Sequence, residues 1–136
     1  MKIFGDPKKE RIVTIVVCSL FIIVIIVSTI IRNSITSKLI NHGIITNGLI
    51  TDITSSVRGD FSIVYSFTFN GRQYKNDYTY SELLLRYQNN FDGKVFPVIY
   101  LPEDPTINYL LVTPNSFKEY DKSFPDSLNW VKLYMK

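Results

Sequence analysis

The sequence has 136 residues, with 15 Lys and Arg against 12 Asp and Glu and a formal net charge of +3. This length accommodates one modest domain and an anchor, which excludes two full domains. Residues 32–136 hold 11 basic and 10 acidic side chains, so they lack the basic excess that nucleic-acid-binding proteins carry on one face. The only cysteine is Cys18, which excludes a disulfide within the domain and a metal site built from cysteine.

An uncharged apolar run from residue 12 to residue 31 is the strongest signal near the N-terminus. A helix of this length rises about 30 Å, which matches the hydrocarbon core of a bilayer. The run is longer than the core of a typical signal peptide and ends without a small-residue cleavage site. Residues 12–31 therefore predict a transmembrane helix that is retained as a signal anchor.

The basic residues that flank the predicted span indicate its orientation. Four of them precede it, and only Arg32 and Lys38 follow it closely. Positive charge is enriched on the cytoplasmic side of membrane helices. We therefore expect a single-pass protein of the cell membrane, with residues 1–11 in the cytoplasm and the domain on the periplasmic or extracellular side.

The segment after the span predicts a helix and then a strand. Residues 32–42 place apolar side chains at helical spacing, which indicates a short continuation of the span or a juxtamembrane helix, and Gly43 ends it. Residues 44–54 predict the first strand, because apolar side chains recur on one face of an extended chain. Glycine within a strand often marks a bulge, so we expect this strand to bend at Gly48. Its apolar face consists of Ile45, Leu49 and Ile53.

The clearest β signal is a period-two pattern over residues 61–69, after a loop at residues 55–60, in which aromatic residues and Ile63 alternate with Ser, Thr and Val64. Asn70 and Gly71 follow, and this pair favours a type I′ turn because both residues tolerate positive φ. Residues 72–80 return as the second strand of a hairpin. One side of that strand is aromatic and carries Tyr74, Tyr78 and Tyr80.

Two further strands are expected after a helical turn at residues 81–90, where Ser81 is a candidate cap. Residues 94–101 are apolar and bounded by turns, which predicts a strand buried on both faces. Pro97 lacks a backbone donor, so we expect it at a sheet edge or a bulge. The last strand is predicted at residues 106–112.

Together these elements predict a single N-terminal transmembrane helix followed by a small mainly-β domain over residues 43–112. About five antiparallel strands with one or two short helices favour a barrel-like or curled sheet, because closure removes exposed edges. The tail, residues 113–136, ends in a short amphipathic segment. That segment packs on the sheet or rests on the membrane interface through Trp130, and the sequence leaves both open.

Three segments of this domain resemble a bacterial family of membrane proteins. They are an early glycine-containing strand, an aromatic strand that runs into a glycine turn, and a strand that ends in a proline turn, at residues 43–50, 65–74 and 93–105. The family is the domain of unknown function numbered three-five-nine-two, and the likeness covers roughly residues 43–110. The resemblance implies a small β domain beside a membrane with no established activity. Many members look as if they carry a second membrane helix after the domain, which is not expected here.

The titratable residues show no pattern typical of a catalytic or metal site. His42 is the only histidine, and we expect it to be a solvated residue at a helix end. Glu103 and Asp104 stand between two prolines, where Asx-type bonding and the fixed φ of proline favour a turn. Asp52 and Asp60 flank the first loop. We therefore expect no enzyme, no cofactor and no metal.

The sequence favours a membrane-anchored, non-catalytic binding or assembly module of the bacterial cell envelope. The anchor would concentrate the domain beside a protein partner, and the expected interaction surface is formed by Tyr74, Tyr78, Tyr80 and Trp130. One alternative is a membrane-anchored immunity protein that neutralises a toxin, although the near-neutral domain lacks the acidic patch that such inhibitors often present. The other is a carboxylate-dependent hydrolase, which would depend on Asp52, Asp60, Glu103 and Asp104.

Overall fold

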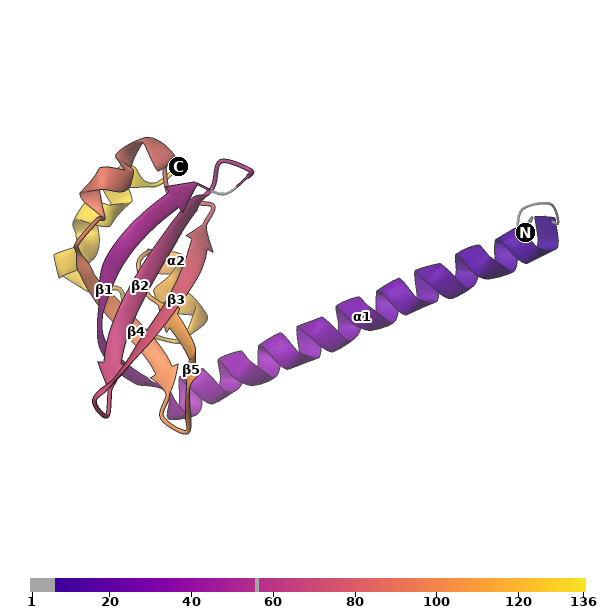
Figure 1. Cartoon of the computed structure of the whole chain (residues 1–136), viewed down its shortest axis with the longest axis horizontal. Coiled ribbons are helices and arrows are strands. Elements are labelled where there is room, and N and C mark those ends of the chain that lie inside the picture. Colours follow the sequence, from indigo (N-terminus) through magenta and orange to yellow (C-terminus); the bar gives the residue numbers. More distant parts are fainter. Residues whose placement is uncertain (1–6, 56) are drawn as a thin grey trace. The chain divides into compact units, whose positions relative to one another are not determined.

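The computed structural model describes residues 7–55 and 57–136 (Figure 1). The chain divides into an N-terminal helical unit that ends at Ile35 and a domain formed by Thr36–Lys136. Its elements are α1 (Pro7–His42), β1 (Ile44–Ser55), β2 (Phe61–Phe69), β3 (Arg72–Tyr80), η1 (Leu85–Asn90), β4 (Val95–Leu101), β5 (Asp104–Leu110), α2 (Pro114–Glu119) and η2 (Asp126–Tyr134).

α1 is one continuous helix of 36 residues, so residues 32–42, predicted as a continuation of the span or a juxtamembrane helix, continue it. The helix is long and apolar enough to cross a bilayer. Thr14 and Ser28 donate their hydroxyl protons to backbone carbonyls one turn earlier, at 2.9 and 2.8 Å. These bonds satisfy the polar atoms without water, as a helix in lipid requires. α1 is thus suited to single-pass anchoring.

Gly43 ends α1, as predicted. Its backbone nitrogen donates to the Leu39 carbonyl oxygen at 2.9 Å. A Cβ atom at residue 43 would lie 2.3 Å from that same oxygen, so only glycine allows the chain to leave the helix this way. Leu39 itself is fully buried, which fixes the last turn of the helix to the domain that follows.

The five strands form one antiparallel sheet in the order β3-β2-β1-β4-β5 (Figure 1). The predicted hairpin is confirmed, since β2 and β3 pair along their whole length. Asn70 and Gly71 connect them with φ values of 50° and 75°, as a type I′ turn requires. The sheet curls into a nearly closed barrel with β3 and β5 as its outermost strands. The alternate residues of β2 fill its core, namely Phe61, Ile63, Tyr65 and Phe67.

β1 carries a bulge at Thr51, so the bulge predicted at Gly48 is wrong. The pairing with β2 advances from Ile50 to Asp52 while the partner strand advances by one residue, which leaves Thr51 extra. Gly48 has a different role, because a Cβ atom there would lie 2.4 Å from Cγ2 of Val98. The absence of a side chain at residue 48 lets β4 pack closely against β1.

The extra residue reverses the alternation of β1 and divides its predicted apolar face. Ile45 and Leu49 precede the bulge, and each is 45% exposed on the outer face of the sheet. Ile53 follows the bulge and pairs with the fully buried Ile63, so it faces the core. The predicted face failed because strict alternation holds only in a strand without an inserted residue.

Pro97 lies inside the sheet, so its predicted position at an edge or bulge is wrong. β4 has a paired strand on each side, and the Pro97 carbonyl accepts a hydrogen bond from the Leu111 nitrogen at 2.8 Å. In an antiparallel ladder, the nitrogen and oxygen of such a residue face the same neighbour. The backbone nitrogen of Pro97 therefore faces Leu111, one residue beyond the end of β5 at Leu110. Its missing hydrogen removes a bond only from this last pair of the ladder.

Two other boundaries differ from the prediction. Residues 81–90 contain only the short 3-10 helix η1, which the extended Leu84 precedes without a side-chain cap, so Ser81 does not cap it. β5 begins and ends two residues earlier than the predicted 106–112, because the turn after β4 has only two residues. β4 was predicted to be buried on both faces, and this holds only from Val98 to Leu101, because Val95 is 54% exposed.

The C-terminal tail packs on the domain, which decides between the two arrangements that the sequence left open. α2 begins with a capping box in which Thr113 and Ser116 bond reciprocally. η2 buries Leu128 and Val131 against the domain. Trp130 is half-buried among aromatic rings of the domain. These contacts make the tail part of the folded unit.

Candidate functional site

The two outermost strands of the sheet are joined by side chains. Asn76 Nδ2 on β3 donates to Asn108 Oδ1 on β5 at 3.3 Å. The same oxygen accepts from the Tyr65 hydroxyl at 2.8 Å. Asn108 Nδ2 donates to the carbonyls of Pro105 and Thr106, at 2.9 and 3.1 Å. Asn108 is only 3% exposed, so this network is a buried structural link between the edges of the sheet.

Two buried phenols near this link stay protonated. Burial raises the pKa of Tyr65 and the pKa of Tyr80 well above their ordinary value of 10.0. Tyr65 donates to Asn108, and the Tyr80 hydroxyl donates to the Leu110 carbonyl. A phenol that burial keeps neutral and that donates to a fixed acceptor is unsuited to serve as a base near neutral pH. Both groups therefore support the fold.

Three of the four aromatic residues predicted as an interaction surface lie together on β3, and the fourth, Trp130, lies elsewhere. Tyr74, Tyr78 and Tyr80 lie on the inner side of β3, and Tyr80 is only 3% exposed. Tyr74 is half-buried and stacks on Phe67, with the ring centroids 5.4 Å apart. The Tyr78 ring meets Tyr109 edge-on at 5.8 Å. Tyr80 is thus removed from the predicted surface, because the curl of the sheet turns this side of β3 inward.

Trp130 belongs to a different aromatic cluster. Its ring centroid lies 5.3 Å from that of Phe91 and 5.9 Å from that of Phe96. Both of these phenylalanines are fully buried, whereas Trp130 is half-exposed. Trp130 is therefore a surface residue that the core holds in place.

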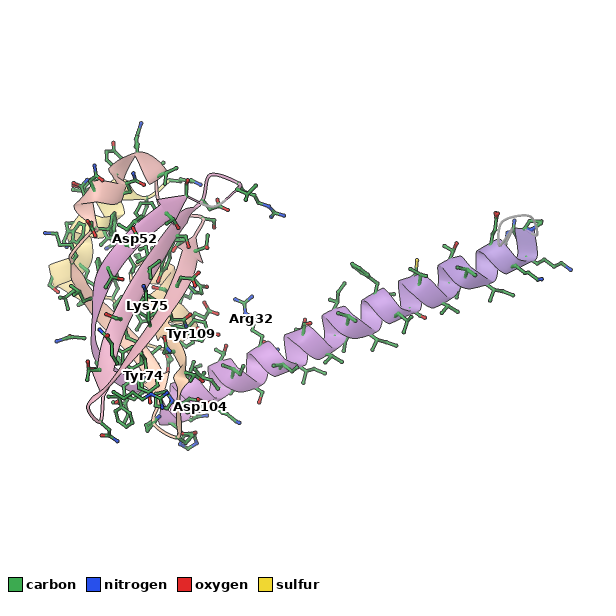
Figure 2. The ribbon with its side chains drawn as sticks, in the orientation of Figure 1. Arg32, Asp52, Tyr74, Lys75, Asp104 and Tyr109 are labelled. Atoms are coloured by element: carbon green, nitrogen blue, oxygen red, sulfur yellow. The ribbon has the colours of Figure 1, made fainter. Side chains whose placement is uncertain are left out.

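The carboxylates considered for a hydrolase lie at opposite ends of the sheet. Asp52 and Asp60 lie near the β1–β2 connection, whereas Glu103 and Asp104 lie at the β4–β5 turn, as Figure 2 shows for Asp52 and Asp104. Asp104 Oδ1 accepts from the backbone nitrogen and the hydroxyl of Thr106, at 3.2 and 2.5 Å, which confirms the predicted turn role. Carboxylates that act on one bond must lie within reach of it, so the four cannot form one site.

Metal ligands do not gather in the part of the chain that the structure describes. No group of three or more His, Cys, Asp or Glu side chains lies close enough there to hold an ion. His42 is exposed as the last residue of α1, which confirms the predicted position.

Glu82 is a residue whose role the sequence analysis missed. Its carboxylate accepts hydrogen bonds from the Thr113 hydroxyl and from Asn115 Nδ2, the latter at 2.7 Å. Both donors lie at the start of α2, where a negative charge is favourable. Thr113 followed three residues later by Ser116 is a pattern typical of a helix start, and it could have predicted the start of α2. Glu82 thus ties the end of β3 to α2.

An exposed apolar strip lies on the outer face of β1 and β4 and consists of Ile45, Leu49 and Val95. Leu49 and Val95 are direct cross-strand partners and are 45% and 54% exposed. Polar side chains border this pair in a shallow groove, including those of Asn47, Ser66 and Gln73. An apolar centre with a polar border is typical of surfaces that bind other proteins. The sequence analysis missed the strip because it placed Ile45 and Leu49 on one face with Ile53, which the bulge turns towards the core instead.

Comparison with known families gives one match. The family described as Domain of unknown function (DUF3592) matches residues 42–115. The matched segment contains all five strands and reaches the start of α2. No curated protein and no solved structure matches the chain.

Proposed function

This chain belongs to the DUF3592 family, and on that premise we propose that it is a membrane-anchored binding or assembly module of the bacterial cell envelope. In this proposal α1 anchors the chain and the β domain holds a protein partner without catalysing a reaction. The exposed apolar strip is the observation that carries the proposal.

The strip supports binding because its apolar side chains are about half exposed to water. Among residues 7–55 and 57–136, every buried side-chain nitrogen and oxygen has a hydrogen-bond partner. The buried polar side chains therefore need no hydrogen bonds from a partner, while Leu49 and Val95 leave apolar surface in water. Covering such surface is favourable by about 25 cal/mol for each Å² removed from water. A partner with an apolar patch and a polar border would complement the strip.

The anchor favours a partner in the same membrane. A tethered domain meets such a partner at a high effective concentration, so a small surface suffices for binding. The basic residues before α1's apolar segment outnumber those after it, which supports a cytoplasmic N-terminus and a domain on the opposite side.

Site-specific photo-crosslinking in native membranes tests the proposal. A photoreactive side chain is placed in the full chain at Leu49 or Val95, with Thr54, which is also exposed on β1, as the control position. We expect one discrete adduct from positions 49 and 95 and none from position 54. Adducts from no position, or equally from all three, would contradict the proposed function.

A second variant shows whether the strip itself is recognised. The substitution Val95→Ser should weaken the adduct formed from position 49, because it removes apolar area from the same surface. Thr54→Ser is the matched control and should leave the adduct unchanged. Both positions are exposed, so stability should change by no more than about 0.5 kcal/mol. Equal adduct yields from the two variants would argue against recognition by the strip.

A further inference from the structure

A second surface feature lies away from the exposed apolar strip. It is a shallow groove, here called the polar groove, lined by Asn89, Asn90, Asp92, Lys94, Trp130 and Tyr134. Its two sides come from segments far apart in the sequence, one at the end of η1 and the start of β4, the other in η2. The groove therefore depends on the folded tail.

Backbone bonds fix the two sides of the polar groove to each other and to the sheet. The Leu84 nitrogen donates to the Tyr134 carbonyl at 2.9 Å, which joins the start of η1 to the end of η2. The Gly93 nitrogen donates to the Ile50 carbonyl at 3.2 Å, and the Ile50 nitrogen donates to the Lys94 carbonyl at 2.9 Å. The turn that carries the polar side chains is thus attached to β1 at the buried Ile50, so the groove is formed before any ligand binds.

Other aromatic rings of the domain fix the two aromatic side chains of the polar groove. Trp130 packs on the buried rings of Phe91 and Phe96, and Tyr134 packs on Tyr87 with the ring centroids 4.9 Å apart. Both groove rings remain half-exposed. Rings that the core already immobilises lose little conformational entropy when a ligand stacks on them, which favours binding.

The polar side of the groove offers donors and acceptors in balance. Asn89 and Asn90 each supply both kinds of group, Asp92 supplies acceptors and Lys94 supplies donors. All four side chains are exposed. The charges of Asp92 and Lys94 cancel, so the groove selects neither an anion nor a cation. A phosphate-bearing nucleic acid would require more positive charge than one lysine provides.

A ligand that fits these groups must be uncharged, rich in hydroxyl groups and apolar on one face. A pyranose sugar ring has all three properties, because its C–H groups form an apolar face and its hydroxyls both donate and accept. We propose that the polar groove binds a neutral saccharide, with the sugar ring stacked on Trp130 and its hydroxyls bonded by Asn90 and Asp92. This site goes beyond the proposed function and uses no residue of the exposed apolar strip.

Intrinsic fluorescence provides a direct test, because Trp130 is the only tryptophan in the chain. The full chain is held in a detergent without a sugar head group and titrated with soluble oligomers of glucose, galactose and N-acetylglucosamine. At least one series should change the emission of Trp130 with a saturable dependence on concentration. No saturable change with any of the three would overturn the proposal.

Substitutions in the polar groove separate recognition from folding. Asn90→Ala and Asp92→Ala should each weaken saccharide binding by about tenfold, since each removes hydrogen bonds to the sugar. Glu103→Ala, which removes an exposed carboxylate at the opposite end of the sheet, should leave binding unchanged. Emission without sugar and the unfolding temperature should match the unsubstituted chain in all three variants. Unchanged affinity in both groove variants, or binding of phosphorylated sugars alone, would overturn the proposal.

Discussion

Asn76 and Asn108 join the two edges of the sheet, with Asn76 Nδ2 lying 3.3 Å from Asn108 Oδ1. β3 and β5 are the outermost strands, so this contact closes the curled sheet through side chains. Exposed strand edges invite pairing with other chains. The amide contact therefore links the two edges to each other and stabilises the domain.

Asn108→Ala should lower the free energy of unfolding by about 1–3 kcal/mol. The buried Tyr65 hydroxyl loses its nearer acceptor, Asn108 Oδ1 at 2.8 Å, and keeps only the backbone carbonyl of residue 108 at 3.3 Å. Asn76→Ala should cost less, since Asn76 is only half-buried. Urea unfolding of the two single variants and the double variant gives the coupling between the residues. We expect the double variant to lose less stability than the sum of the singles. Strict additivity would mean that the two amides do not interact.

Gly48→Ala should destabilise the domain by about 1–3 kcal/mol, because the new methyl group would overlap Cγ2 of Val98. Val98→Ala removes that methyl and should restore part of the loss when both substitutions are present. Thermal unfolding of the single and double variants measures this rescue. If the double variant loses as much stability as the sum of the two single losses, or more, Val98 does not cause the effect of Gly48→Ala.

Alkaline pH should destabilise the domain from about pH 10 upward. Burial raises the pKa of Tyr65 and the pKa of Tyr80 above the value of 10.0 that they regain on unfolding. Between about pH 10 and the raised pKa values, the folded state binds more protons than the unfolded state, so the free energy of unfolding falls as the pH rises. Below about pH 10 both states keep these phenols protonated, so the two groups do not change stability. Urea unfolding at a series of pH values measures the slope.

Tyr65→Phe provides the control for the alkaline effect. The variant loses one of the two buried phenols, so the fall in stability above about pH 10 should become shallower. Its stability at neutral pH should also be lower, because Asn108 loses a hydrogen-bond donor. An alkaline slope identical to that of the unsubstituted chain would show that Tyr65 ionises equally in both states.

The apolar segment of α1 should hold the whole chain in the membrane fraction after alkaline washing, with release only by detergent. Ile22→Lys places a charge near the centre of the segment and should raise the cost of insertion by about 2.5–3.5 kcal/mol. Ile22→Leu is the matched control and should behave like the unsubstituted chain. Recovery of the unsubstituted chain from the soluble fraction without detergent would contradict anchoring by α1.

The long helix and the β2–β3 hairpin could be predicted because local signals determine them. An uncharged apolar segment of this length has few other stable environments, and Asn70-Gly71 after a period-two pattern specifies a tight turn. The role of Asp104 followed in the same way from the neighbouring prolines. In each case the deciding interactions lie within a few residues along the chain.

The positions that the sequence could not give depend on contacts between distant segments. The exposure of Leu49 follows from a bulge that appears only when β1 pairs with β2. The internal position of Pro97 follows from where β5 ends, and the burial of Tyr80 follows from the curl that brings β3 towards β5. The polar groove likewise joins η1 to a tail whose packing the sequence left open.

The extra residue at Thr51 has a consequence for comparing members of this family. On its N-terminal side even-numbered residues such as Ile50 point inward, whereas on its C-terminal side the odd-numbered Ile53 does. A relative that lacks one residue here would keep its fold only with its hydrophobic positions moved by one place on one side of the gap. Sequence alignments of β1 should therefore be anchored separately on each side of residue 51.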